Sequence, residues 1–261
     1  MQNEKYYGAL MSETEIEITF PLPITRPRRL RSHAQLRRLV QENYLQTDDL
    51  VLPLFIREDI EEKKPIESMF GHYQLSIKDL KKEILSISKL NIPAVLLFGV
   101  PKHKDSMGTS SCDQDGIIQK AIREIKENSP NTLVITDLCF CEYTDHGHCG
   151  IINHHTGKAD VDNDGTLELL IQQAISHVEA GTDVIAPSGM MDGMVGAIRA
   201  ALDECGYDFI PILSYAVKYS SSLYGPFRDA AQGAPKFGNR QSYQMNYANS
   251  GEALREAELD I

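Results

Sequence analysis

Short apolar runs alternate with amphipathic stretches along most of this 261-residue chain, and this alternation restricts the folds that it can adopt. The apolar runs are rich in residues that favour strands, and they lie at 50–56, 92–100, 132–138, 183–187, 210–214 and 242–245. Apolar residues spaced three and four apart predict helices around 80–87, 117–125, 167–178 and 195–202. Strands that are apolar throughout are typical of parallel sheets covered on both faces. The repeated βα units therefore predict either a (β/α)8 barrel or a doubly wound sheet.

Polar residues at the ends of the predicted strands favour the barrel. Asp137, Ser188 and Lys218 lie at or after the carboxyl ends of three different strands, and a barrel builds one shared site from the carboxyl ends of several strands. A doubly wound sheet would have a glycine-rich phosphate loop after its first strand, and none follows residues 50–56. We predict an α/β fold of the TIM-barrel class in which about six of the eight strands are present and the barrel is incomplete at the C-terminus.

Two helix boundaries carry recognisable signals. Ser76 and Asp79 are spaced as in a capping box, so we expect a helix to begin after Ser76. Gly181 follows Ala180 at the place that a left-handed helix C-cap would use.

The N-terminal segment differs from the rest of the chain. Residues 1–42 are proline-rich and basic, and we assign them to an extended arm ahead of a TIM-barrel catalytic domain at 43–261. The arginine-rich run at 26–38 could bind nucleic acid or an acidic partner, but it lacks interleaved aromatic residues and favours an arm that contacts another subunit. The formal net charge of −11 argues against a general nucleic-acid binder, because phosphate affinity depends on clustered cations.

The lengths of the apolar runs, the N-terminal residues and the number of cysteines predict a cytoplasmic protein. No run approaches the roughly 18 to 20 consecutive apolar residues of a membrane span, and the first twenty residues show no signal-peptide pattern. The five cysteines are an odd number, and Cys112 and Cys205 lie far from the other three, unlike an extracellular disulfide framework. We therefore expect reduced thiols and no membrane partner.

Three cysteines follow the predicted strand at 132–138. Side chains alternate along a strand, so Cys139 and Cys141 should leave on one face, and a glycine-containing loop lets Cys149 fold back toward them. Three thiolates suit a soft-ligand metal, and zinc with three protein ligands keeps a position open, as catalytic sites do. The sequence thus predicts a catalytic zinc site.

Two alternatives stay open for this cluster. Free cysteines are among the most buried residues, so the three could be core residues without a metal. His146 and His148 could add zinc ligands, or they could face the substrate or support the ligands, and we assign neither to the metal.

Lys218 is the candidate nucleophile. It lies at the end of a predicted buried strand, where burial and neighbouring cations would lower the pKa of its amine and favour Schiff-base formation with a ketone or aldehyde. A lysine at a strand end can also simply extend to water. Arg228 and Arg240 follow closely and are suited to bidentate recognition of a carboxylate, so a keto acid would fit both groups.

The sequence resembles the porphobilinogen synthase family, whose members are also called 5-aminolevulinate dehydratases. The resemblance runs from about residue 24 to the end of the chain. It is carried by Arg26-Pro-Arg-Arg-Leu-Arg31, Phe98-Gly-Val-Pro101, Asp137-Leu-Cys-Phe-Cys-Glu-Tyr-Thr-Asp-His-Gly-His-Cys-Gly150, Ala186-Pro-Ser-Gly-Met-Met-Asp-Gly193, Ser214-Tyr-Ala-Val-Lys218, Tyr224-Gly-Pro-Phe-Arg228 and Ser242-Tyr-Gln-Met245.

The resemblance implies a metal-dependent condensation of two 5-aminolevulinate molecules to porphobilinogen, with loss of two waters, in tetrapyrrole (haem) biosynthesis. It implies a Schiff base at Lys218, with Asp137 close to the reacting groups. The other implied roles are zinc binding by Cys139, Cys141 and Cys149, carboxylate binding by Arg228, Arg240 and Gln244, and active-site positions for Ser188 and Tyr224.

The resemblance also implies a homo-octamer, with the arm wrapped around a neighbouring barrel. Glu256 resembles a glutamate that binds an allosteric magnesium in bacterial members. The family's second Schiff-base lysine and eighth strand have no counterpart here, so we expect this 261-residue form to have little or no activity by itself. The competing hypotheses are a Schiff-base aldolase for another keto acid, and a non-catalytic fragment that binds metal or modulates assembly.

Overall fold

The structure is a computed structural model that describes residues 25–261, and it divides the chain into two compact units, 1–45 and 46–261. The described part of the first unit contains a 3-10 helix, η1 (Pro27–Arg31), and a short helix, α1 (Ala34–Leu39), with no buried residue in either. His33 caps α1, because its Nδ1 accepts a hydrogen bond from the Gln35 amide at 3.1 Å. The predicted division between arm and catalytic domain at 42/43 stays a prediction, and the part of the arm before residue 25 lies outside the described residues.

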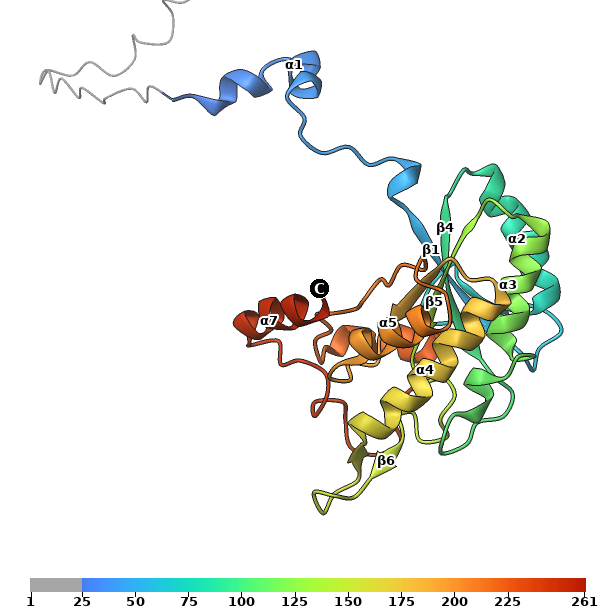
Figure 1. The fold of residues 1–261 in the computed structure, drawn as a ribbon. Helices are drawn as coiled ribbons and strands as arrows, with labels where there is room; N and C mark the ends of the chain where they lie inside the picture. The colour runs from blue at the N-terminus through green and yellow to red at the C-terminus, as the bar shows by residue number, and fades with distance from the viewer. Residues whose placement is uncertain (1–24) are drawn as a thin grey trace, which may run out of the picture. The chain divides into compact units, whose positions relative to one another are not determined.

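A mostly parallel sheet forms the centre of the second unit (Figure 1). Its strands lie in the order β2-β3-β1-β4-β5-β8, and all neighbours are parallel except β2 and β3. Their bounds are β1 (Val51–Arg57), β2 (Lys64–Pro65), β3 (Tyr73–Leu75), β4 (Ala94–Val100), β5 (Leu133–Leu138) and β8 (Val184–Pro187). A small separate hairpin pairs β6 (Ile152–Asn153) with β7 (Asp160–Val161).

Four helices pack side by side in chain order against one face of this sheet. They are α2 (Ile77–Lys89), α3 (Ile117–Asn128), α4 (Asn163–Ala180) and α5 (Met194–Glu204). All four predicted helices are confirmed. The Ser76 hydroxyl accepts a hydrogen bond from the Asp79 amide at 3.2 Å, and Gly181 ends α4 with a φ of +104°, so both predicted boundaries are also confirmed.

The remaining elements are short. They comprise the 3-10 helices η2 (Thr47–Asp49), η3 (Thr109–Cys112) and η4 (Ser222–Tyr224), and the helices α6 (Gly225–Ala230) and α7 (Ser250–Asp260). No helix in the described part of the chain combines the length and apolar character that crossing a bilayer requires.

Both faces of the sheet are covered, which explains why its strands are apolar throughout. On the outer face, buried Leu54 and Ile56 pack against isoleucines and leucines of α2 and α3. On the inner face, α6 closes over the strands. The Phe55 and Phe98 rings stack at 5.2 Å between centroids, and Phe98 meets Phe227 edge-on at 4.9 Å. This packing holds α6 against the inner face of β1 and β4.

Two of the six predicted strands are not strands in the structure. Residues 210–214 lie beside β8, with the Ile185 amide donating to the Pro211 carbonyl at 3.1 Å and the Leu213 amide donating back to the Ile185 carbonyl at 2.8 Å. They occupy the place of the next parallel strand, but Pro211 has no N–H, so the ladder stays short. Residues 242–244 instead form a turn and a bend, and Met245 forms only an isolated parallel bridge with Tyr219. The short strands β2 and β3 were not predicted.

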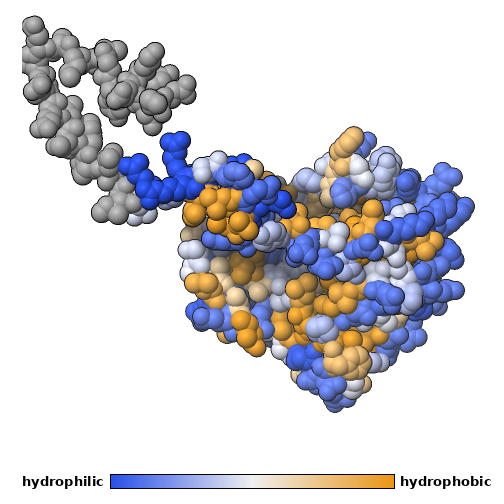
Figure 2. All heavy atoms as spheres, turned by 90° about the horizontal axis from the view of Figure 1, so that it is seen from above, coloured by the Kyte–Doolittle hydropathy of each residue, from blue (hydrophilic) through white to orange (hydrophobic). Residues whose placement is uncertain are grey.

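The fold class is confirmed as α/β, with the parallel strands and outer helices of a TIM-barrel protein. Among the described residues, the sheet ends at β2 on one side and at β8 on the other and does not close into a barrel. Apolar side chains are exposed on one face of the second unit (Figure 2). Exposed apolar residues of this unit include Val51, Leu133, Leu213, Leu254 and Leu259.

Candidate active site

The three predicted cysteines converge directly after β5. Cys139, Cys141 and Cys149 are all buried, and their sulfurs lie within 4.8 Å of one another. Gly147 permits the loop to fold back, because it has a φ of +74° and a Cβ there would lie 2.2 Å from the Ala234 carbonyl oxygen. None of the three forms a disulfide. Three free converging sulfurs are a donor set that fits a soft or borderline divalent metal.

Negative charge is unevenly shared among these sulfurs. Hydrogen bonds from Cys139 and Cys141 hold the pKa of the Cys149 thiol well below its usual range, and the charges of Arg240 and Lys218 lower it further. The pKa of Cys139 is instead raised well above its usual range, since it donates to its two neighbours and is buried. Cys149 is therefore the sulfur of the cluster that loses its proton most readily.

Lys218 lies close to the sulfurs. Its side chain is 6% exposed, and its Nζ donates to the Ser188 carbonyl at 2.8 Å. The rings of Tyr215 and Tyr224 lie 5.3 Å and 5.7 Å from the ammonium nitrogen. Ser188 and Tyr224 thus belong to the surroundings of this amine.

The pKa of Lys218 shifts in the direction opposite to our expectation. Burial lowers it, but the negative charges of Cys139, Cys149 and Asp137 outweigh burial and raise it. Sequence reasoning placed cations beside this lysine, whereas the fold surrounds it with anions. A divalent cation on the sulfurs would offset their charge and lower the pKa of the amine.

Asp137 is the penultimate residue of β5, two positions before Cys139, and it is 8% exposed. Burial and the nearby charge of Glu142 raise the pKa of this carboxyl well above its usual range, against the opposing effects of Lys218 and the Ser188 hydroxyl. Its Oδ1 has no hydrogen-bond partner among the described residues. A carboxyl in this state can exchange protons with groups close to Lys218.

The predicted carboxylate-binding residues have unused polar atoms. Arg240, 3% exposed, donates to the carbonyls of Gly147 and Gly233, the former at 2.9 Å, which places its guanidinium against the cysteine loop. Within the part of the chain that the structure describes, Arg228 Nε, Arg240 Nε and Gln244 Oε1 are buried without partners. Buried polar atoms normally pair, so these suit a polar ligand.

The two histidines of the cysteine loop bind other parts of the protein. His148 pairs its Nδ1 with the Tyr243 hydroxyl and its Nε2 with the Phe237 carbonyl, both at 3.0 Å. His146 Nε2 lies 3.3 Å from the Ser106 carbonyl oxygen. Neither belongs to a set of converging metal-ligand atoms among the described residues.

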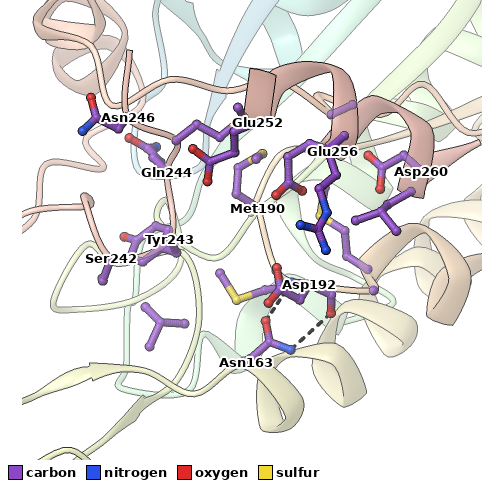
Figure 3. Close-up of a pocket in the computed structure, with 18 of the residues that line it drawn as sticks. Asn163, Met190, Asp192, Ser242, Tyr243, Gln244, Asn246, Glu252, Glu256 and Asp260 are labelled. Atoms are coloured by element: carbon purple, nitrogen blue, oxygen red, sulfur yellow. Dashed lines mark hydrogen bonds between the residues drawn. The ribbon is translucent and has the colours of Figure 1, made fainter. Parts of the chain in front are cut away.

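Glu256 lies apart from the sulfurs, on α7. It lines a cavity of about 750 Å³, where Glu252, Glu256 and Asp260 face Asp192 (Figure 3). Burial and the charges of Asp192, Glu252 and Asp260 raise the pKa of Glu256. Gln244 lines the same cavity, so this acidic group borders the proposed carboxylate site.

Sequence reasoning missed Glu142. It is 2% exposed, and its Oε2 accepts a hydrogen bond from Cys141 Sγ at 3.3 Å. Strand alternation would direct Glu142 away from Cys141, but the chain leaves β5 at Leu138 and turns. Its position beside a predicted metal ligand was the only available signal.

Comparisons with known proteins agree with this arrangement. Residues 24–261 match the family model described as delta-aminolevulinic acid dehydratase. The chain is 53% identical over 236 residues to the delta-aminolevulinic acid dehydratase of Staphylococcus aureus, which covers 90% of this chain and 72% of the relative.

A solved structure is also similar. It is delta-aminolevulinic acid dehydratase (porphobilinogen synthase) from Toxoplasma gondii ME49 in complex with the reaction product porphobilinogen, with a TM-score of 0.87 and 41% identity. The likeness covers 92% of this chain and 68% of that one. The chain therefore belongs to the delta-aminolevulinic acid dehydratase family.

Proposed function

We propose that this chain acts as a porphobilinogen synthase, which condenses two 5-aminolevulinate molecules to porphobilinogen with loss of two waters in tetrapyrrole biosynthesis. The observation that carries this proposal is the buried amine of Lys218 beside three converging sulfurs, together with the unpartnered guanidinium nitrogens of Arg228 and Arg240 that could bind a carboxylate. A keto acid with an amino group presents a ketone for the amine and a carboxylate for the arginines.

Lys218 would act as the nucleophile. Its neutral amine attacks the substrate ketone, a C–N bond forms, and the ketone oxygen leaves as water to give a Schiff base. Asp137 is the group placed to take up and return protons in these steps, because it is buried and close enough to Lys218 for each group to shift the pKa of the other. Tyr215 and Tyr224 cover the amine and limit the access of bulk water.

Arg228, Arg240 and Gln244 would hold the substrate carboxylate. A carboxylate is the ligand that satisfies buried guanidinium N–H groups, and bidentate contact fixes its orientation. A backbone hydrogen bond links the two residues, because the Gln244 backbone amide donates to the Arg240 carbonyl at 2.8 Å. The two side chains would therefore position the ketone relative to Lys218 together.

Cys139, Cys141 and Cys149 would hold the metal, for which we propose zinc. Zinc held by these three sulfurs would supply a Lewis acid that polarises a substrate oxygen or amine. For Glu256 we propose an allosteric magnesium, supported by the carboxylates that face it.

Borohydride trapping tests the function. Incubation with 5-aminolevulinate and borohydride, followed by peptide mass mapping, should give a reduced adduct at Lys218. Lys218→Arg should abolish the adduct, and Lys236→Arg, an exposed lysine of the following segment, should leave it unchanged. Adducts from other keto acids without one from 5-aminolevulinate would instead support the aldolase.

We further propose that the chain forms a cytoplasmic homo-octamer. The exposed apolar residues Leu39 and Val40 beside the arginines of α1 support a subunit contact. Zinc binding and assembly without turnover are also what a non-catalytic fragment would show. Light scattering gives the assembly size, and porphobilinogen formation by the purified chain would exclude the non-catalytic alternative.

A further inference from the structure

Glu142 is a buried acid with no role in the proposed function. Its side chain is 2% exposed, and its Oε1 has no hydrogen-bond partner in the described structure. Among the described residues, its side chain is hydrogen-bonded only to Cys141, one of the sulfurs that would bind the first metal. A buried carboxyl oxygen without a partner is unfavourable unless a further donor or a cation satisfies it.

A second buried carboxyl group also has an oxygen without a hydrogen-bond partner. Asp137 Oδ1 is also buried and unpartnered within residues 25–261, and ligand atoms of Asp137, Cys139 and Glu142 all lie within 4.8 Å of one another. Two buried carboxylates and one sulfur therefore converge on a common point. This set shares only Cys139 with the three-sulfur cluster.

The nearby lysines Lys104 and Lys218 do not supply a hydrogen bond to Glu142. The charge of Glu142 opposes the burial that lowers the pKa of Lys104, but Lys104 Nζ donates to the Gln232 carbonyl at 2.8 Å. Lys218 Nζ donates to the Ser188 carbonyl. Neither ammonium forms a described hydrogen bond with Glu142.

We propose that Asp137, Glu142 and Cys139 form a second cation site beside the three-sulfur cluster, sharing the Cys139 sulfur, and that it takes a borderline divalent cation such as zinc. Zinc accepts carboxylate oxygen and thiolate sulfur together, whereas magnesium and calcium prefer oxygen ligands alone. This site goes beyond the proposed function, which places one metal at the three sulfurs and another at Glu256. While a cation occupies the second site, Asp137 would be one of its ligands and would not exchange protons.

Zinc titration of the metal-free chain tests the proposal. With free zinc held low by a competing chelator, the wild-type chain should bind one more equivalent than Glu142→Gln, which keeps the size of the side chain and removes its charge. X-ray absorption at the zinc edge should show zinc–zinc scattering in the doubly loaded wild type and none in Glu142→Gln. Circular dichroism verifies that the variant is folded.

Asp145→Asn is the matched control, because Asp145 is an exposed acid three residues away in the same loop. It should bind as many equivalents as the wild type. Asp137→Asn should also lose one equivalent, and it replaces Glu142→Gln if that variant does not fold. Equal stoichiometry in wild type and Glu142→Gln, or no zinc–zinc scattering in the wild type, overturns the second site. Borohydride trapping at Lys218 tests the proposed function separately.

Discussion

At the scale of single residues, the most unusual buried group outside the site is His177. It lies in α4 with no exposed surface, and neither ring nitrogen has a hydrogen-bond partner among the described residues. Leu170, Ala174 and Val178 of the same helix belong to an apolar cluster. Burial lowers the pKa of His177 from 6.5 to about 3, so it is neutral in the folded chain.

His177 should make the chain sensitive to acid. Between pH 6.5 and about 3 the unfolded chain binds a proton at this residue and the folded chain does not, so stability falls as pH falls. The expected slope is about 1.4 kcal/mol of unfolding free energy per pH unit. His177→Leu should remove this slope and, because it also removes two unsatisfied nitrogens, cost little at pH 7.5. Urea unfolding at pH 7.5, 6.0 and 5.0 measures both effects.

His155→Gln provides the control for this experiment, because His155 is exposed. It should show the pH dependence of the wild type. Equal slopes for wild type and His177→Leu would mean that His177 is protonated or paired in the folded chain.

At the scale of elements, strand β4 is pressed closely against its neighbours at Gly99. A Cβ at this position would lie 2.5 Å from the Tyr143 hydroxyl and 2.7 Å from Ile118 Cγ1. Tyr143 comes from the cysteine loop and Ile118 from α3, so the glycine allows the loop, the strand and the helix to approach one another.

Gly99→Ala should therefore destabilise the second unit by about 1–3 kcal/mol through overpacking. Gly196→Ala is the matched substitution in α5, where no atom lies within 4 Å of the added Cβ. It should stabilise the helix by about 0.5–1 kcal/mol, since alanine loses less backbone entropy than glycine. Chemical unfolding measures both, and a neutral Gly99→Ala would show that Tyr143 and Ile118 can move aside.

Local sequence patterns explain which helices and strands could be predicted. Helices α2 to α5 were predictable because each carries a long apolar stripe, and Ser76 and Gly181 mark boundaries by local hydrogen bonds and backbone conformation. The segment at 210–214 was misassigned because Pro211 interrupts the ladder. Local spacing also found the three cysteines, since they lie within one loop.

Other parts of the site depend on contacts between distant segments. Arg240 reaches the cysteine loop only because residues 233 and 147 are brought together, and the anions around Lys218 come from β5 and its loop. No local pattern encodes such contacts. This is why the chemical type of each residue was predictable, whereas the direction of the Lys218 pKa shift and the burial of Glu142 were not.

At the scale of the whole molecule, the three sulfurs lie where separate parts of the second unit meet. The Ser188 amide donates to the Leu138 carbonyl at 3.0 Å, which links the segment after β8 to the end of β5. Gly233 approaches Cys141 so closely that a Cβ there would lie 3.2 Å from its sulfur. A metal held at this junction would stabilise contacts among segments that are distant in sequence.

Removal of metal should consequently lower the stability of the entire second unit. A ligand that binds only the folded chain adds about 2.7 kcal/mol at a free concentration one hundred times its Kd. We expect the zinc-loaded chain to melt several degrees above the chelator-treated chain, and Cys149→Ser to lose most of that difference. Cys205→Ser is the control, because Cys205 is exposed and remote from the cluster, and it should keep the full difference. Differential scanning calorimetry at fixed free zinc measures the shift. An equal shift in Cys149→Ser and wild type would place the stabilising metal elsewhere, and the acidic group around Glu256 would be the next site to test by Glu256→Gln.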